Sequence, residues 1–84
     1  MNKKQQQTLE RIFEKLERSD IAWHDIESLF KALGADLSEG KGSRVRVALK
    51  DVRAVFHRPH PRRVTNKSTI RSVRRFLLET GVKG

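Results

Sequence analysis

Apolar residues recur at helical spacing in three segments of the chain. In each segment they lie three or four positions apart, which places them along one stripe of a helix. The three stripes are Leu9, Ile12, Phe13 and Leu16; Ile26, Leu29, Phe30 and Leu33; and Ile70, Val73, Phe76 and Leu77. We therefore expect a helix over residues 5–18, a second helix that ends at Gly34, and a third that is capped by Thr65 or Asn66 and ends at Gly81.

After Gly34 the apolar period changes from helical spacing to strict alternation, which is typical of strands. The segments RVRVAL (44–49) and VRAVFHR (52–58) alternate throughout, and ADLSE (35–39) is a shorter strand candidate. The predicted fold class is α+β, in the order α-α-β-β-β-α. The helices are expected to pack against one face of a three-stranded antiparallel sheet.

The two longer strands are separated only by Lys50 and Asp51, a connection short enough for a tight hairpin although it lacks the usual glycine. A two-residue hairpin fixes the register, so Leu49 is expected to pair with Val52. The predicted polar face of this hairpin then carries Arg44, Arg46, Ala48, Arg53, Val55 and His57. In this register His57 lies directly opposite Arg44.

Charge is distributed unevenly along the chain. The full chain has 19 Lys and Arg residues against 10 Asp and Glu residues. Residues 1–40 contain 6 basic and 8 acidic side chains, whereas residues 41–84 contain 13 basic and 2 acidic ones, and nine of those 13 are arginine. Such a segment indicates a surface that binds a polyanion, most commonly nucleic acid. The alternative is a basic protein that neutralises an acidic protein partner.

Length and composition limit the classes of function. A chain of 84 residues forms one small domain with a modest core, so an enzyme of this size is expected to act on a large substrate that lies across its surface. There are no cysteines, which fits a reducing cytosol and predicts a cytoplasmic location. No apolar run is long enough to span a membrane, and MNKKQQQ is not followed by the apolar region of a secretory signal.

The segment VFHRPHPRR (55–63) has three interpretations: a metal site, a catalytic site, or a strand ended by prolines. A metal ion would need ligands beyond His57 and His60, and the cationic surroundings oppose a divalent ion, so no metal and no small-molecule cofactor is expected. Proline cannot donate to a strand ladder, so Pro59 and Pro61 are expected to end the second long strand.

General-base chemistry is the catalytic interpretation of this segment. The like charges of Arg44 and Arg58 disfavour protonation of His57, which leaves it able to accept a proton near neutral pH. RNA cleavage requires little more, since the 2′-hydroxyl of the substrate is itself the nucleophile. The structural alternative is that His57 is a half-exposed strand residue and His60 a loop residue that stabilises the turn.

Three stretches of the sequence, ESLFKALGADLSEGKGSRVRVAL, VFHRPHPRR and TIRSVRRFLLETGV, resemble the HicA family of bacterial toxins. The matching pieces are Leu33-Gly34, Gly42-Ser43, Pro59-His60-Pro61 and Gly81-Val82, within about residues 21–82. The resemblance implies a double-stranded-RNA-binding-like fold, a metal-independent mRNA endoribonuclease activity and neutralisation by a HicB antitoxin. It divides the chain into a polar tail with an extra amphipathic helix (1–20) and a HicA-like domain (21–84), together forming a single compact unit.

The sequence departs from this family at one position. Similar toxins usually carry the catalytic histidine directly after the glycine-serine turn, where this chain has Arg44. Either His57 has taken over the role from across the hairpin, or nuclease activity is lost and only a binding surface remains. The candidate catalytic residues are His57 and His60. The candidate RNA-binding residues are Lys41, Ser43, Arg44, Arg46, Arg53, Arg58, Arg62 and Arg63.

The expected function is therefore that of a toxin that cleaves mRNA and is held inactive by a HicB-like antitoxin. Two other functions stay open: a catalytically inactive RNA-binding module of the same fold, and a DNA-binding regulator. The arginines of the last helix, Arg71, Arg74 and Arg75, are ambiguous, since they can contact RNA, solvent or an antitoxin.

Overall fold

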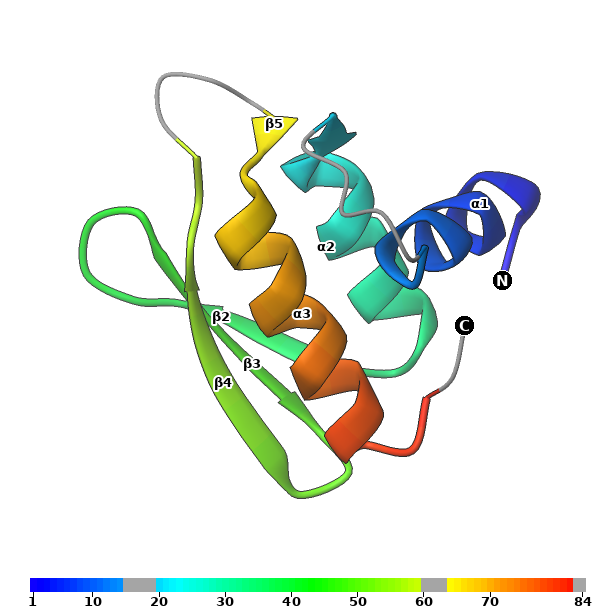
Figure 1. Ribbon diagram of the computed structural model, residues 1–84. Helices are drawn as coiled ribbons and strands as arrows, with labels where there is room; N and C mark the ends of the chain where they lie inside the picture. Colours follow the sequence, from blue (N-terminus) through cyan, green and yellow to red (C-terminus); the bar gives the residue numbers. More distant parts are fainter. Residues whose placement is uncertain (15–19, 60–63, 83–84) are drawn as a thin grey trace.

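The computed structural model describes residues 1–14, 20–59 and 64–82 of the chain (Figure 1). Its elements are α1 (Lys3–Ile12), β1 (Ile21–Ala22), α2 (Trp23–Ala32), β2 (Asp36–Glu39), β3 (Arg44–Leu49), β4 (Val52–His57), β5 (Val64–Thr65) and α3 (Lys67–Glu79). The predicted α+β class and the predicted order of helices and long strands are confirmed. Two short strands, β1 and β5, are additional.

The three long strands form an antiparallel sheet in the order β2-β3-β4. The predicted register of the hairpin is confirmed, because Leu49 pairs with Val52 and Arg44 pairs with His57. Both turn residues have positive φ angles, 48° for Lys50 and 66° for Asp51. This is the backbone of a type I′ turn, whose twist matches that of the strands it joins. The hairpin thus forms without the usual glycine, and this register determines which side chains share each of its faces.

The strands β1 and β5 pair with each other and form a second, two-stranded sheet. Ile21 lies opposite Thr65, and Ala22 lies opposite Val64. Strands of two residues have no periodicity to detect, so the alternation of apolar positions gave no sign of them. The pairing holds the start of α2 beside the start of α3 (Figure 1).

Helix α1 differs most from its expected bounds. It begins at Lys3 because the Asn2 Oδ1 accepts a hydrogen bond from the Gln5 backbone N–H at 2.8 Å, while the Gln5 Oε1 accepts one from the Asn2 N–H at 2.9 Å. This reciprocal arrangement is a capping box. The helix ends at Ile12, earlier than the predicted end at residue 18, and Leu16 lies outside the described residues.

The other predicted helix ends are confirmed. The Asn66 Oδ1 accepts a hydrogen bond from the Thr69 backbone N–H at 2.8 Å and so caps α3. Gly34 and Gly81 follow α2 and α3 with φ angles of 89° and 87°, which other residues rarely adopt. These caps fix the lengths of the two helices that lie on the sheet.

The core lies between the sheet and the helices. Helices α2 and α3 cover one face of the sheet, and α1 lies on their side turned away from it (Figure 1). Phe30 of α2 stacks on Phe56 of β4, and the rings of Trp23 and Phe76 pack around this pair. Burying each such side chain stabilises the fold by about 1.5–3 kcal/mol. The fully buried members of the core are Ile12, Ile21, Ile26, Leu29, Phe30, Val45, Val47, Ile70, Val73 and Leu77.

Candidate functional site

The face of the sheet opposite the helices is open and basic. Alternation along the strands directs the side chains of Arg44 and Arg46 from β3, and of Arg53, Val55 and His57 from β4, toward this face, and all five residues are exposed. The partners that alternate with them, such as Val45 and Phe56, are buried against the helices. The fold therefore brings four of the predicted site residues, His57 and three arginines, onto one surface.

Arg44 and His57 are the closest of these residues in the strand ladder. They are direct Cα partners, and the next pair along is joined by a hydrogen bond from the Arg58 backbone N–H to the Ser43 carbonyl oxygen at 2.9 Å. Antiparallel ladders alternate between hydrogen-bonded and non-hydrogen-bonded pairs, so Arg44 and His57 form a non-hydrogen-bonded pair, with Cα atoms about 4.5 Å apart. Side chains approach each other most closely in such pairs. The side chains of His57 and Arg44 therefore start from adjacent backbone positions on a face in contact with solvent.

Gly40 gives Arg44 room on its other side. The Gly40 N–H donates a hydrogen bond to the Arg44 carbonyl oxygen at 3.0 Å, and a Cβ at residue 40 would lie 3.0 Å from the Arg44 Cβ. Any larger residue at position 40 would therefore push against the side chain that faces His57. The turn that follows contains Lys41 and Ser43, which are both exposed beside this pair.

The arginines of the open face carry charges that the protein does not neutralise. Within residues 1–14, 20–59 and 64–82, no carboxylate forms an ion pair with Arg44, Arg46 or Arg53. The acidic residue on this face, Asp36, lies on β2 on the far side of Ala48 from Arg53. A surface with several unpaired guanidinium groups attracts phosphate groups and binds them bidentately.

Arg58 follows His57 in the chain but lies on the opposite side of the sheet. Its Nε donates to the Glu27 Oε2 at 2.8 Å, and its Nη1 and Nη2 donate to the two carboxylate oxygens of Glu39 at 2.7 and 2.6 Å. The Glu27 carboxylate also accepts a hydrogen bond from the Trp23 Nε1. We call this group of Arg58, Glu27 and Glu39 the Arg58 clamp. It joins the end of β4 to helix α2 and to the edge strand β2.

The ionisation of the clamp follows from its hydrogen bonds. Those from Arg58 hold the pKa of the Glu39 carboxyl below its ordinary value, and those accepted by Glu39 and Glu27 raise the pKa of the Arg58 guanidinium. The RNA-binding role expected of Arg58 stays a prediction, and in the fold two carboxylates hold its guanidinium. Glu27 and Glu39, which lie 31 and 19 residues from Arg58, were not anticipated as its partners, because no local pattern links them.

Three predicted site residues, His60, Arg62 and Arg63, lie outside the described residues. Their roles stay predictions.

The arginines of α3 separate into different environments. The Arg74 Nε donates to the Ile12 carbonyl oxygen at 2.8 Å, and its Nη2 donates to the Glu14 carbonyl oxygen at 3.3 Å. These carbonyl groups lie at and just beyond the end of α1, where carbonyl oxygens have no N–H donor within the helix. Arg71 and Arg75 are exposed on the same helix. Arg74 therefore fixes α1 to α3.

Neither a metal centre nor a membrane span is found in the described part of the chain. No group of three or more His, Cys, Asp or Glu side chains in residues 1–14, 20–59 and 64–82 is placed to hold a metal ion. None of the helices in those ranges has the length and apolar character needed to cross a bilayer.

Comparison with known proteins agrees with this architecture. The sequence model of the family described as "HicA toxin of bacterial toxin-antitoxin" matches residues 23–81, which is more than half of the chain and includes α2, the whole three-stranded sheet and α3. No curated protein and no solved structure matches the chain. Helix α1 and strand β1 lie before the matched segment. The chain belongs to the HicA toxin family of bacterial toxin–antitoxin systems.

Proposed function

We propose that this chain is the toxin of a type II toxin–antitoxin system and acts in the cytoplasm as a metal-independent mRNA endoribonuclease that a HicB-like antitoxin neutralises. The observation that carries the proposal is the Arg44–His57 pair on the open face of the sheet. Similar toxins usually have their catalytic histidine at the position of Arg44. The register brings the imidazole of His57 next to that position from the neighbouring strand.

The reaction uses the substrate's own nucleophile. His57 accepts the proton of a 2′-hydroxyl group, the freed oxygen forms a bond to the adjacent phosphorus, and the bond from phosphorus to the 5′ oxygen breaks. The leaving 5′ oxygen takes a proton from solvent, and the products are a 2′,3′-cyclic phosphate and a 5′-hydroxyl. The Arg44 guanidinium stabilises the negative charge that develops on the phosphoryl oxygens.

The remaining candidate residues hold the RNA strand in this proposal. Arg46 and Arg53 contact phosphates along the open face, and Lys41 and Ser43 contact the strand at the turn. The charges of Lys41, Arg46 and Arg53 lack carboxylate partners in the described part of the chain, which leaves them available to phosphates. Arg62 and Arg63 are proposed to extend this surface, and His60 is the second catalytic candidate.

Incubation of the purified protein with single-stranded RNA and DNA in EDTA tests the proposal. We expect RNA fragments that end in 2′,3′-cyclic phosphate or 3′-phosphate, with no DNA cleavage. His57→Ala should lower the cleavage rate by about 100-fold or more, since general-base catalysis contributes factors of this size. His24→Ala is the matched control, because His24 is an exposed histidine at the start of α2. A fully active His57→Ala protein would contradict the role given to His57.

One observation favours a second function, a catalytically inactive RNA-binding module. Arg44 stands where the family usually has its catalytic histidine, and an arginine cannot accept a proton at neutral pH. In the same assay, RNA that is bound but left intact would support this alternative. Binding of DNA alone would instead support a DNA-binding regulator.

A further inference from the structure

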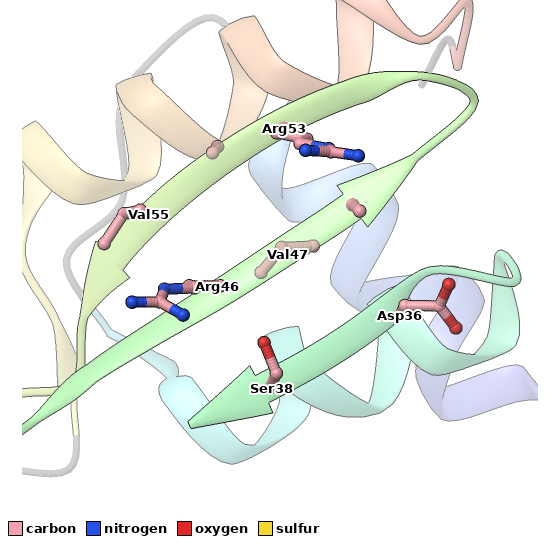
Figure 2. A pocket seen from close by; sticks show the side chains of 8 residues that line it. Asp36, Ser38, Arg46, Val47, Arg53 and Val55 are labelled. Atoms are coloured by element: carbon pink, nitrogen blue, oxygen red, sulfur yellow. The ribbon is translucent and has the colours of Figure 1, made fainter. Parts of the chain in front are cut away.

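The open face of the sheet contains a hollow at some distance from the Arg44–His57 pair. Its volume is about 510 Å³, within the range of sites that bind small molecules or single groups of a larger ligand. The side chains that line it on the open face come from all three strands, as Figure 2 shows. They are Asp36, Ser38, Arg46, Ala48, Arg53 and Val55.

The strand register explains the shape of this hollow. Asp36, Ala48 and Arg53 lie in one row across β2, β3 and β4, so the small Ala48 side chain is flanked by two larger, charged ones. Neighbouring strands are about 4.8 Å apart, which separates the backbones of Asp36 and Arg53 by about 10 Å. The methyl group of Ala48 therefore forms a low floor between a carboxylate on one side and a guanidinium on the other.

The floor is apolar although its surroundings are charged. Val55, in the next row, is 54% exposed and lies directly opposite Arg46. An exposed valine and an alanine between arginines form a surface on which the flat face of an aromatic ring can lie. Arginine side chains also stack on such rings. The hollow therefore combines a site for a planar ring with cations for the phosphates beside it.

We propose that this hollow binds one unstacked base of the RNA substrate and that Asp36 selects guanine there. This inference rests on the proposed RNA-binding function of the chain. Along the strands, the row of Ala48 lies about 13 Å from the Arg44–His57 row, so a nucleotide close to the cleaved phosphate can reach it. The hollow would then determine where the RNA is cut.

The preference for guanine follows from hydrogen-bond donors and acceptors. A carboxylate has two acceptor oxygens and no donor. Guanine is the base whose Watson–Crick edge presents two adjacent donors, its N1–H and its N2 amino group, so both carboxylate oxygens of Asp36 can accept from it. Uracil presents a single N–H between two carbonyl oxygens, which the carboxylate repels. In the described part of the chain no cation forms an ion pair with Asp36, so its oxygens are available.

A binding experiment tests this inference without depending on cleavage. Fluorescence anisotropy would measure the affinity of the protein for 2′-O-methyl oligonucleotides, which lack the nucleophilic hydroxyl. One probe contains only uracil, and the others carry a single guanine, adenine or cytosine at the central position. We expect about tenfold tighter binding of the guanine probe than of the uracil probe, as a good bidentate pair provides.

The variants separate base selection from charge. Asp36→Asn should reduce the guanine-to-uracil ratio of affinities to near one. Asp51→Asn removes the same charge at the hairpin turn, away from the hollow, and asparagine tolerates the positive φ found there. It should tighten binding of all probes equally and leave the ratio unchanged. Ala48→Ile fills the floor with a residue that suits strands, and should also lower the ratio.

The outcomes distinguish the hollow from the wider proposal. Wild-type protein that binds all four probes equally, or a ratio that Asp36→Asn leaves unchanged, would overturn the selection of guanine. Binding of poly-glutamate in place of RNA would identify an acidic protein as the occupant and would also overturn it. A guanine preference in a protein that cleaves no RNA would support the hollow while contradicting the nuclease function.

Discussion

His57 and Arg58 are neighbours in the chain, yet they belong to two chemically different regions. His57 lies on the open face of the sheet with Arg44, Arg46 and Arg53, where the charges of the arginines lack carboxylate partners in the described residues. Arg58 lies on the helix side, where Glu27 and Glu39 hold its guanidinium. One step along a strand therefore separates a cation that is available to a ligand from one that is already bound.

This difference shows that the number of arginines in a segment does not determine how many of them can bind a ligand. A segment with many arginines predicts an interaction with a polyanion, but each guanidinium contributes to that interaction only if the protein leaves it unpaired. The alternation of a strand decides which side each one occupies, and the partners on that side decide its role. We expect the open face to control RNA binding and the Arg58 clamp to control stability. Variants of the two regions test this separation.

Removal of the clamp arginine should have the largest effect on stability. Arg58→Met leaves Glu27, whose side chain is only 19% exposed, without its counter-charge. Because both groups retain partial contact with water, we expect the free energy of unfolding to fall by about 1–2 kcal/mol. Chemical denaturation measures it. Arg46→Met is the matched control and should change stability by no more than about 0.5 kcal/mol; equal decreases in the two variants would contradict the comparison.

Removal of arginines from the open face should have the converse effect. Arg46→Met and Arg53→Met should each weaken RNA binding several-fold, because each removes one cation that binds phosphate. The slope of log affinity against log salt concentration should become shallower by about 0.7 for each phosphate of a single strand that the variant no longer neutralises. Titrations at several salt concentrations measure this slope. If Arg58→Met changes the slope as much as these variants do, the clamp arginine also binds RNA.

The two carboxylates of the clamp should differ in importance. Glu27→Gln should destabilise the protein more than Glu39→Gln, because Glu27 is largely buried and also accepts a hydrogen bond from Trp23, whereas the Glu39 side chain is 70% exposed. We expect about 1 kcal/mol for Glu27→Gln. Thermal unfolding of both variants beside the wild-type protein measures the difference. The reverse order would mean that the edge strand, and not α2, anchors Arg58.

The smallest effect should be a dependence of stability on pH. The pKa of Glu39 is lowered in the folded protein by its hydrogen bonds with Arg58, so this group stabilises the fold above the pKa of an unfolded glutamate, about 4.3. That contribution disappears as the pH falls through the lower pKa of the folded state. Denaturant midpoints between pH 6 and pH 3 should therefore decrease less in Glu39→Gln than in the wild-type protein. Parallel decreases would contradict this.

Much of the fold could be predicted because its signals are local. Apolar stripes identified all three helices, and a two-residue connection fixed the register that brings His57 opposite Arg44. The start of α1 also had a local signal, the capping box between Asn2 and Gln5, but it lay within a stretch interpreted as a polar tail. Strands β1 and β5 are too short to show a period.

The clamp could not be predicted for a different reason. Its three charged residues come from α2, from β2 and from the end of β4. The alternation along the hairpin indicates that Arg58 faces away from His57, but no local pattern indicates that Glu27 and Glu39 lie on that side. The position of Asp36 in the hollow could not be predicted for the same reason. Asp36 is part of a weak strand and had no assigned role, and only the pairing of β2 with β3 shows that it shares a hollow with Arg53. Such features depend on partners that only the folded chain brings together.

The hydrogen bond from Arg74 to the Ile12 carbonyl oxygen has a consequence for synthesis on the ribosome. The two residues are separated by 62 positions, and protein chains emerge from the ribosome with their N-terminal end first. Helix α1 is therefore made early but lacks this hydrogen bond until α3 has been made and has packed on the core. For most of translation the chain lacks its complete fold, so any function that depends on this fold begins only near the end of the chain's own synthesis.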